Sequence, residues 1–232
     1  MSRFLLAAAV AALSLSACAD VGDAPAATTG AAVDSAAAAA PTFTGTAVPI
    51  DTAQSRITWT AAKPTRTHEG GFGQFAGSLY VDGGQVTGAE VTAQTATIFS
   101  DVERLTEHLK SADFFDAAQY PEVQFVVTSL TPLATGTTAD STADDAEGAV
   151  APTHTATGTI SMHGQTHNVE FPVSVVMQNG VATADADFTI DRQDWGLVYP
   201  GQPDDLIQDE VRINLHIVGG AAAGQAETAP SM

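Results

Sequence analysis

Cationic residues, cysteine and long apolar runs are all scarce in this 232-residue chain. Lys and Arg number only 8 against 27 Asp and Glu, which gives a formal net charge of −19. Such an acidic surface repels a phosphate backbone, so nucleic-acid binding is excluded. The single cysteine, Cys18, leaves no intramolecular disulfide and no thiolate metal cage, so the hydrophobic core must provide the stability.

The longest apolar run, residues 4–13, lies near the N-terminus and follows a single arginine. It is too short to cross a bilayer as a helix but suits the core of a signal peptide. Residues 15–18 (LSAC) then resemble the lipobox of bacterial lipoproteins, in which the cysteine is acylated and becomes the new N-terminus. We therefore predict a lipoprotein signal peptide over residues 1–17 and a lipid anchor on Cys18; an ordinary signal peptide with a chance cysteine is the alternative. No Asp directly follows the cysteine, which favours the outer membrane of the cell envelope.

Three segments have too few large apolar side chains to build a core. Residues 18–42 are predicted to be a disordered, Ala-rich linker, and residues 220–232 a disordered tail. Residues 135–152 carry carboxylates and no basic residue, which predicts an acidic surface loop inserted in the domain. A calcium site is the alternative for this loop, but the ligand spacing of an EF-hand is missing. The remaining residues, 43–219, form the predicted domain.

Within this domain apolar and polar residues alternate with a period of two, which is typical of half-buried antiparallel strands. The alternating segments are residues 57–62, 75–81, 91–98, 123–127, 169–175, 184–190 and 211–217. Turn signals at residues 163–166 and 178–180 predict hairpins. The pattern predicts an all-β domain, an antiparallel up-and-down β-barrel of about eight strands.

One short helical excursion interrupts the strands over residues 101–118, because Leu105 and Leu109 stand at helical spacing among charged residues. Two aromatic residues, Phe114 and Phe115, follow them. We expect these four side chains to close one end of the barrel or to wall its mouth.

The segments next to this excursion, residues 111–116 (SADFFD) and 120–125 (YPEVQF), resemble the signature of the YceI-like family. Further segments that resemble the family in the same order are residues 51–63, 71–77, 158–164, 192–196 and 209–213. The resemblance implies a lipocalin-like barrel, periplasmic or secreted, that binds polyisoprenoids or other long amphiphiles.

Several aromatic residues stand on the apolar phases of their strands or close to a strand end. We expect most of them to be core and some to line a lipid cavity. These cavity candidates are Trp59, Phe75, Phe125, Phe171, Phe188 and Trp195.

The sparse cations include one short cluster, Lys63, Arg66 and His68. In so acidic a chain this cluster is the candidate site for an anionic headgroup, and Arg192 is a second candidate. The alternative for the cluster is a solvated strand end whose cations neutralise nearby carboxylates. For Arg192 the alternative is a structural ion pair with Asp194.

Enzymatic patterns are weak. His163 and His167 are four residues apart but flank a glycine turn rather than share a helix, so solvent-facing histidines are favoured over metal ligands. His68 and Glu69 form an acid–base pair without a nucleophile motif, a phosphate loop or a metal-ligand set. We expect no catalytic residues, no metal and no cofactor.

The sequence therefore predicts an extracytoplasmic, membrane-anchored binding protein for a long-chain lipid or isoprenoid, held in the barrel as carrier or reservoir. A barrel filled by its own side chains, serving as a surface interaction module, is the alternative, and an uncharacterised enzyme is the third. The oligomeric state and the identity of the ligand stay open.

Overall fold

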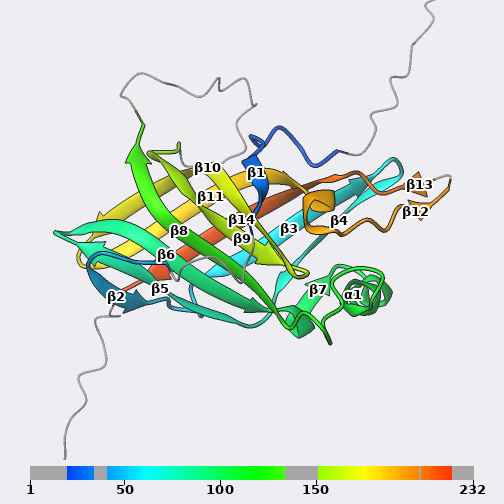
Figure 1. Cartoon of the computed structure of the whole chain (residues 1–232), viewed down its shortest axis with the longest axis horizontal. Helices are drawn as coiled ribbons and strands as arrows, with labels where there is room; N and C mark the ends of the chain where they lie inside the picture. The colour runs from blue at the N-terminus through cyan, green and yellow to red at the C-terminus, as the bar shows by residue number, and fades with distance from the viewer. Residues whose placement is uncertain (1–19, 34–40, 134–150, 204, 221–232) are drawn as a thin grey trace, which may run out of the picture.

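The computed structural model describes part of the chain, and Figure 1 draws the remainder as a thin grey trace. The predicted signal peptide, Cys18 and the tail beyond residue 220 lie outside the described residues, as does almost all of the predicted acidic loop. The described ranges are 20–33, 41–133, 151–203 and 205–220.

Within these ranges the chain forms mainly β-strands, with one α-helix and two 3₁₀ turns. No helix in the described ranges has enough length and apolar character to cross a membrane. The elements are, in chain order, β1 (Thr28–Val33), β2 (Thr46–Pro49), β3 (Arg56–Lys63), β4 (Arg66–Phe72), β5 (Phe75–Asp82), β6 (Gln85–Gln94), η1 (Thr95–Thr97), β7 (Ile98–Ser100), α1 (Glu103–Lys110), β8 (Glu122–Pro132), β9 (His154–Met162), β10 (Gln165–Gln178), β11 (Val181–Asp191), η2 (Arg192–Trp195), β12 (Gly201–Gln202), β13 (Asp205–Leu206) and β14 (Glu210–Gly219).

Twelve of the strands form one antiparallel sheet in the order β2-β5-β6-β8-β9-β10-β11-β14-β3-β4-β7, with β1 added on β10. The sheet curls around one interior and forms a half-barrel (Figure 1). A bridge between Ile50 and Gly219 ties the β2 end of the sheet back to β14. The predicted all-β, lipocalin-like architecture is confirmed. The sheet has more strands than expected because the short strands β2 and β7 and the N-terminal β1 extend it.

The alternation of the sequence decides which side chains face the interior. In β11, for example, Ala186, Phe188 and Ile190 are buried. The Phe188 ring is fully enclosed and stacks on the Phe171 ring of β10, with the ring centroids 4.2 Å apart. These buried side chains join a hydrophobic cluster that runs through the barrel.

Strands β10 and β11 pair only near the turn that connects them, from Gln178↔Val181 to Ser174↔Asp185. Asn179 and Gly180 form this turn with φ angles of 52° and 80°, a left-handed backbone that these two residues adopt more easily than others. Beyond Ser174 the two strands separate, so the early part of β10 and the late part of β11 cannot satisfy each other's backbone groups.

An N-terminal arm, residues 20–33, fills this gap. Its strand β1 pairs with β10 between Thr28↔Glu170 and Val33↔Thr166. On the other side of the arm, the Ala27 N–H donates a hydrogen bond to the Thr189 carbonyl of β11 at 2.8 Å. The arm is thus a strand of the barrel wall.

The prediction of a disordered linker over residues 18–42 is therefore wrong for residues 20–33. The composition indicated disorder because the arm has few large apolar side chains. The arm is held instead by backbone hydrogen bonds, which do not depend on apolar side chains, and its β-branched Thr28 and Thr29 suit a strand. At its beginning Val21 is buried, and the Val21 carbonyl accepts a hydrogen bond from Arg212 at 3.3 Å.

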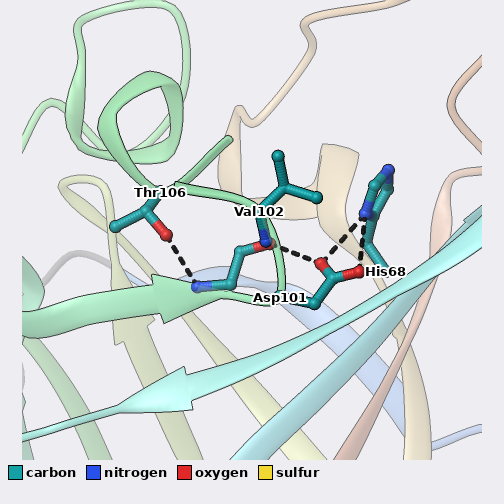
Figure 2. Close-up of polar contacts among 5 residues, drawn as sticks. His68, Asp101, Val102 and Thr106 are labelled. Carbon is teal, nitrogen blue, oxygen red and sulfur yellow. Dashed lines mark hydrogen bonds and ion pairs between the residues drawn. The ribbon is translucent and has the colours of Figure 1, made fainter. Parts of the chain in front are cut away.

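The helix α1 forms where the sequence predicted a helical excursion. Leu109 is buried and Leu105 is half-buried against the core, as their spacing indicated. Polar contacts fix the beginning of the helix: the Ser100 N–H donates to Thr106 Oγ1 at 2.8 Å, and His68 Nδ1 lies 3.0 Å from Asp101 Oδ1. Figure 2 shows these contacts, which tie the helix to β4.

Candidate functional site

The interior of the half-barrel contains a first apolar cavity of about 60 Å³. It lies toward the β5–β6 and β10–β11 turns, and Leu79, Val86, Phe171 and Ala184 are among its walls. Thr159 is the one polar residue that lines it among the described residues. A cavity with such walls favours a hydrocarbon chain over water.

A second apolar cavity, of about 90 Å³, lies under α1. Its walls include Trp59 of β3, Met162 of β9 and Ile213 of β14. Phe125 of β8 lines both this cavity and the first one. The two cavities therefore follow one another inside the same barrel.

Aromatic side chains close the outer end of the second cavity. Phe114 and Phe115 line it together with Leu109, which agrees with the predicted closure of one barrel end. The Phe114 ring lies 5.0 Å from the His108 ring and 5.1 Å from the Tyr199 ring, centroid to centroid. We call the side chains of His108, Phe114, Phe115 and Tyr199 the aromatic lid. It joins α1 to the segment that follows η2.

Arg192 is the charged residue that lines the second cavity, and it is buried. Its guanidinium donates to the carbonyls of Leu197 and Gln208 and to Asp209 Oδ1, the last at 3.0 Å. The ion pair forms with Asp209 and not with Asp194, which the structural alternative had named. The reason is that the chain leading into β14 runs beside η2, where the Arg192 N–H also donates to the Asp209 carbonyl at 2.9 Å. Through these contacts the Arg192 guanidinium holds the segment between η2 and β14 in place.

The predicted cationic cluster lies on the β3–β4 hairpin, where Lys63 and Arg66 are paired across the two strands. Lys63 Nζ is 2.6 Å from Asp205 Oδ2 of β13, and this hydrogen bond lowers the pKa of Asp205 below its usual value. His68 is bound to Asp101. Arg66 is exposed. The hairpin therefore carries one ammonium engaged with a carboxylate and one guanidinium that faces solvent.

The Asp101 carboxylate has two opposing influences on its protonation. Burial raises its pKa, while hydrogen bonds from Ser100 and His68 lower it, and the pKa of Asp101 is lowered overall. The carboxylate therefore stays ionised near neutral pH and holds His68 at the beginning of the α1 segment. His68 of β4 is therefore tied to the segment that leads into α1.

The predicted cavity aromatics divide into three groups. Trp59, Phe125 and Phe171 line the cavities. Phe188 and Trp195 are fully enclosed core residues, and the indole N–H of Trp195 donates to the Ile160 carbonyl at 3.0 Å. The sixth candidate, Phe75, is half-buried against the core.

Most residues that line the second cavity were not among the predicted ligand-binding residues, and three of them show why. Phe72 stands at the end of a polar strand, and Leu197 and Ile207 lie in a segment without periodicity. The signal that could have found them is their position within or beside the segments 71–77, 192–196 and 209–213, which resemble the family and meet at this barrel end.

A third hollow, open and about 750 Å³ in volume, lies on the outer face of β3, β4 and β14. The first residues of the arm form one of its walls, and Thr58, Thr60 and Glu69 line its floor. Arg212 also lines it and is paired with Asp187, whose carboxylate raises the pKa of Arg212. These polar walls suit water and not a hydrocarbon chain, so the interior is the candidate site.

The histidines weighed as metal ligands have separate partners. His163 Nδ1 is 3.2 Å from the Trp195 carbonyl, and His167 Nδ1 is 2.9 Å from the Gly30 carbonyl of the arm. The prediction that both face solvent is wrong for His167, which is buried because the arm covers it. Within the part of the chain that the structure describes, no three His, Cys, Asp or Glu side chains gather as a metal site would require.

Residues 49–219 match the YceI-like domain. The chain belongs to the YceI-like family. The N-terminal arm lies outside the matched residues, so this YceI-like protein adds a wall strand to the matched unit.

Among curated relatives, a UPF0312 protein of Pseudomonas putida is 27% identical over 155 residues, which cover 62% of this chain and 71% of the relative. Burkholderia cenocepacia BcnA is similar in structure, with a TM-score of 0.57 and 24% identity over 73% of this chain and 98% of that one. A polyisoprenoid binding domain from Saccharophagus degradans has a TM-score of 0.55 and 14% identity over 76% of this chain and 99% of that one. These likenesses show the fold that the YceI-like chain shares with them.

Proposed function

We propose that this protein binds a long-chain amphiphile, such as a polyisoprenoid or its phosphate, inside the half-barrel and acts as a carrier or reservoir. The observation that supports this most is the succession of two apolar cavities along the interior. A chain that leaves water for such a site gains roughly 0.8 kcal/mol per buried methylene group. The structural likeness to a domain named for polyisoprenoid binding supports the same ligand class.

The size of the cavities favours a second candidate function. At about 60 and 90 Å³ they are well below the roughly 300–1,000 Å³ of small-molecule sites. A barrel filled by its own side chains would serve as a surface interaction module. A carrier, in contrast, has to enlarge these cavities, so binding of a long chain requires the aromatic lid to move. Surface pairs such as His108–Asp113 and His68–Asp101 hold the lid region, and such pairs contribute little stability.

Native mass spectrometry of the full chain, incubated with a lipid extract of its host, separates the two functions. Carrier function predicts a stoichiometric adduct whose mass identifies an amphiphile, and the adduct should survive removal of the bulk lipid. A spectrum that contains only the bare chain would contradict the carrier function and favour the module.

A charged headgroup, we infer, lies at Lys63 and Arg66. Ala61 lines the second cavity, and Lys63 follows two residues later on the same face of β3, at the barrel end. In a chain with a net charge of −19, an anion needs such a local source of positive charge. The headgroup would compete with Asp205 for the Lys63 ammonium.

Replacing both Lys63 and Arg66 by Gln should lower the affinity for a phosphorylated isoprenoid by about tenfold or more. The reason is that charge-assisted contacts are worth about 1.5–3 kcal/mol. The neutral alcohol with the same chain should bind almost as it does to the wild type. Isothermal titration calorimetry with both ligands measures the difference. An equal loss for both would indicate damaged packing, and no loss for either would make the cluster a solvated strand end.

Membrane attachment through Cys18 is also part of the proposal, with the protein in the cell envelope at the outer membrane. It rests on the lipobox-like residues 15–18 and on the signal-peptide pattern before them. Replacing Cys18 with Ser should move the protein from the membrane fraction to the soluble fraction. Retention in the membrane fraction after a high-salt wash would refute the anchor.

A further inference from the structure

Phe125 occupies a singular position in the barrel. Among the described residues it is the one that lines both cavities. It lies in the middle of the wall, where β8 pairs with β6 at Val91 and with β9 at Ile160. Both of these neighbours are buried, and Phe125 itself is 8% exposed, so the ring lies inside the barrel between the two cavities that it lines.

The two cavities are each too small for a long chain, so such a ligand must extend through both of them. The path between them passes the Phe125 ring. A ring held between packed neighbours leaves its preferred rotamer only at a cost, and it loses its packing contacts when it does so. A short chain can occupy one cavity without this cost, whereas a long chain must displace the ring.

We propose that Phe125 divides the interior into two compartments and thereby sets the length of apolar chain that the barrel accepts. The inference rests on the proposed binding function and adds its selectivity. The ligand class is a linear apolar chain, and affinity stops rising at the chain length that fills one compartment.

The test uses the full chain and a series of isoprenoid alcohols that differ by one isoprene unit. In the wild type, affinity should rise with length and then level off or fall. In Phe125→Ala the two compartments join, and the limit should move to longer alcohols, with about a tenfold gain for the long alcohols relative to the short ones. Phe125→Leu, which keeps more of the core volume, should move the limit in the same direction and guards against a variant that fails to fold.

The matched control is Phe171→Ala, because Phe171 lines only the first cavity. This variant enlarges one compartment without joining the two, so the limit should stay at the wild-type length. If Phe125→Ala and Phe125→Leu bind alcohols but keep the wild-type limit, the proposal is overturned. The same holds if Phe171→Ala moves the limit as far as Phe125→Ala does.

Xenon provides a second readout that does not depend on the isoprenoid ligand, because xenon enters dry apolar cavities. The wild type should bind xenon at two separate sites, and Phe125→Ala should bind it in one continuous region. Xenon that already occupies one continuous region in the wild type would overturn the partition. If no alcohol binds while the two xenon sites merge in the variant, the partition stands and the proposed ligand class fails.

Discussion

Replacing Phe188 with Ala lowers the free energy of unfolding by about 3–5 kcal/mol, the range for large aromatic-to-alanine changes in a core. Phe188 is completely buried, and its ring stacks on Phe171 at a centroid distance of 4.2 Å. This stack connects β10 and β11 inside the barrel, within the region where the two strands no longer pair. The variant therefore loses both buried area and an internal contact across the gap.

Urea-induced unfolding followed by circular dichroism measures this loss for the domain. The matched control is Phe99→Ala, because Phe99 is 46% exposed on the short strand β7. A surface change of that kind should alter the free energy of unfolding by about 0.5 kcal/mol or less. Equal effects of the two variants would mean that the interior is not packed as described.

The second large effect is expected for the N-terminal arm. Replacing Thr28–Val33 with Gly and Ser residues of the same number should lower the free energy of unfolding by about 2–4 kcal/mol, since a glycine in a strand interior costs roughly 0.5–1 kcal/mol of backbone entropy and has no side chain to favour the strand. The change weakens the ladder between β1 and β10. It also uncovers His167, which is buried and bonded to the Gly30 carbonyl.

A control for the arm retains its strand character: T28V together with T29V keeps the backbone and the β-branched shape of both side chains. This control should unfold at the wild-type denaturant concentration. An unchanged midpoint for the Gly and Ser variant would show that the arm contributes nothing to the folded unit.

The arm shows where prediction from the sequence reaches its limit. The long strands could be predicted because a buried face requires a period of two, as in Ala186, Phe188 and Ile190. Residues 20–33 have no such pattern, and their order depends on an open strand edge of β10 that lies far away in the sequence. Local composition cannot show a vacant edge, so the arm was predicted to be disordered.

The candidate site was predictable to a similar degree. Aromatic residues on strand faces indicated cavity walls, and Trp59, Phe125 and Phe171 line the two cavities. The same pattern also selected Phe188, because periodicity shows that a side chain faces inward but not whether a neighbour fills the space beside it. The partner of Arg192 was missed for a related reason: Asp209 is distant in sequence, and only the packing of the segment before β14 brings it close.

The most direct test of the central claim is to locate a bound chain. A photoreactive isoprenoid alcohol, with a diazirine on its apolar end, is bound to the full chain and irradiated, and the labelled residues are mapped by peptide mass spectrometry. Binding in the half-barrel predicts labels on the walls of the two cavities, such as Trp59, Phe125 and Phe171. Labels confined to exposed apolar residues such as Phe99 and Val198, with an unlabelled interior, would contradict it.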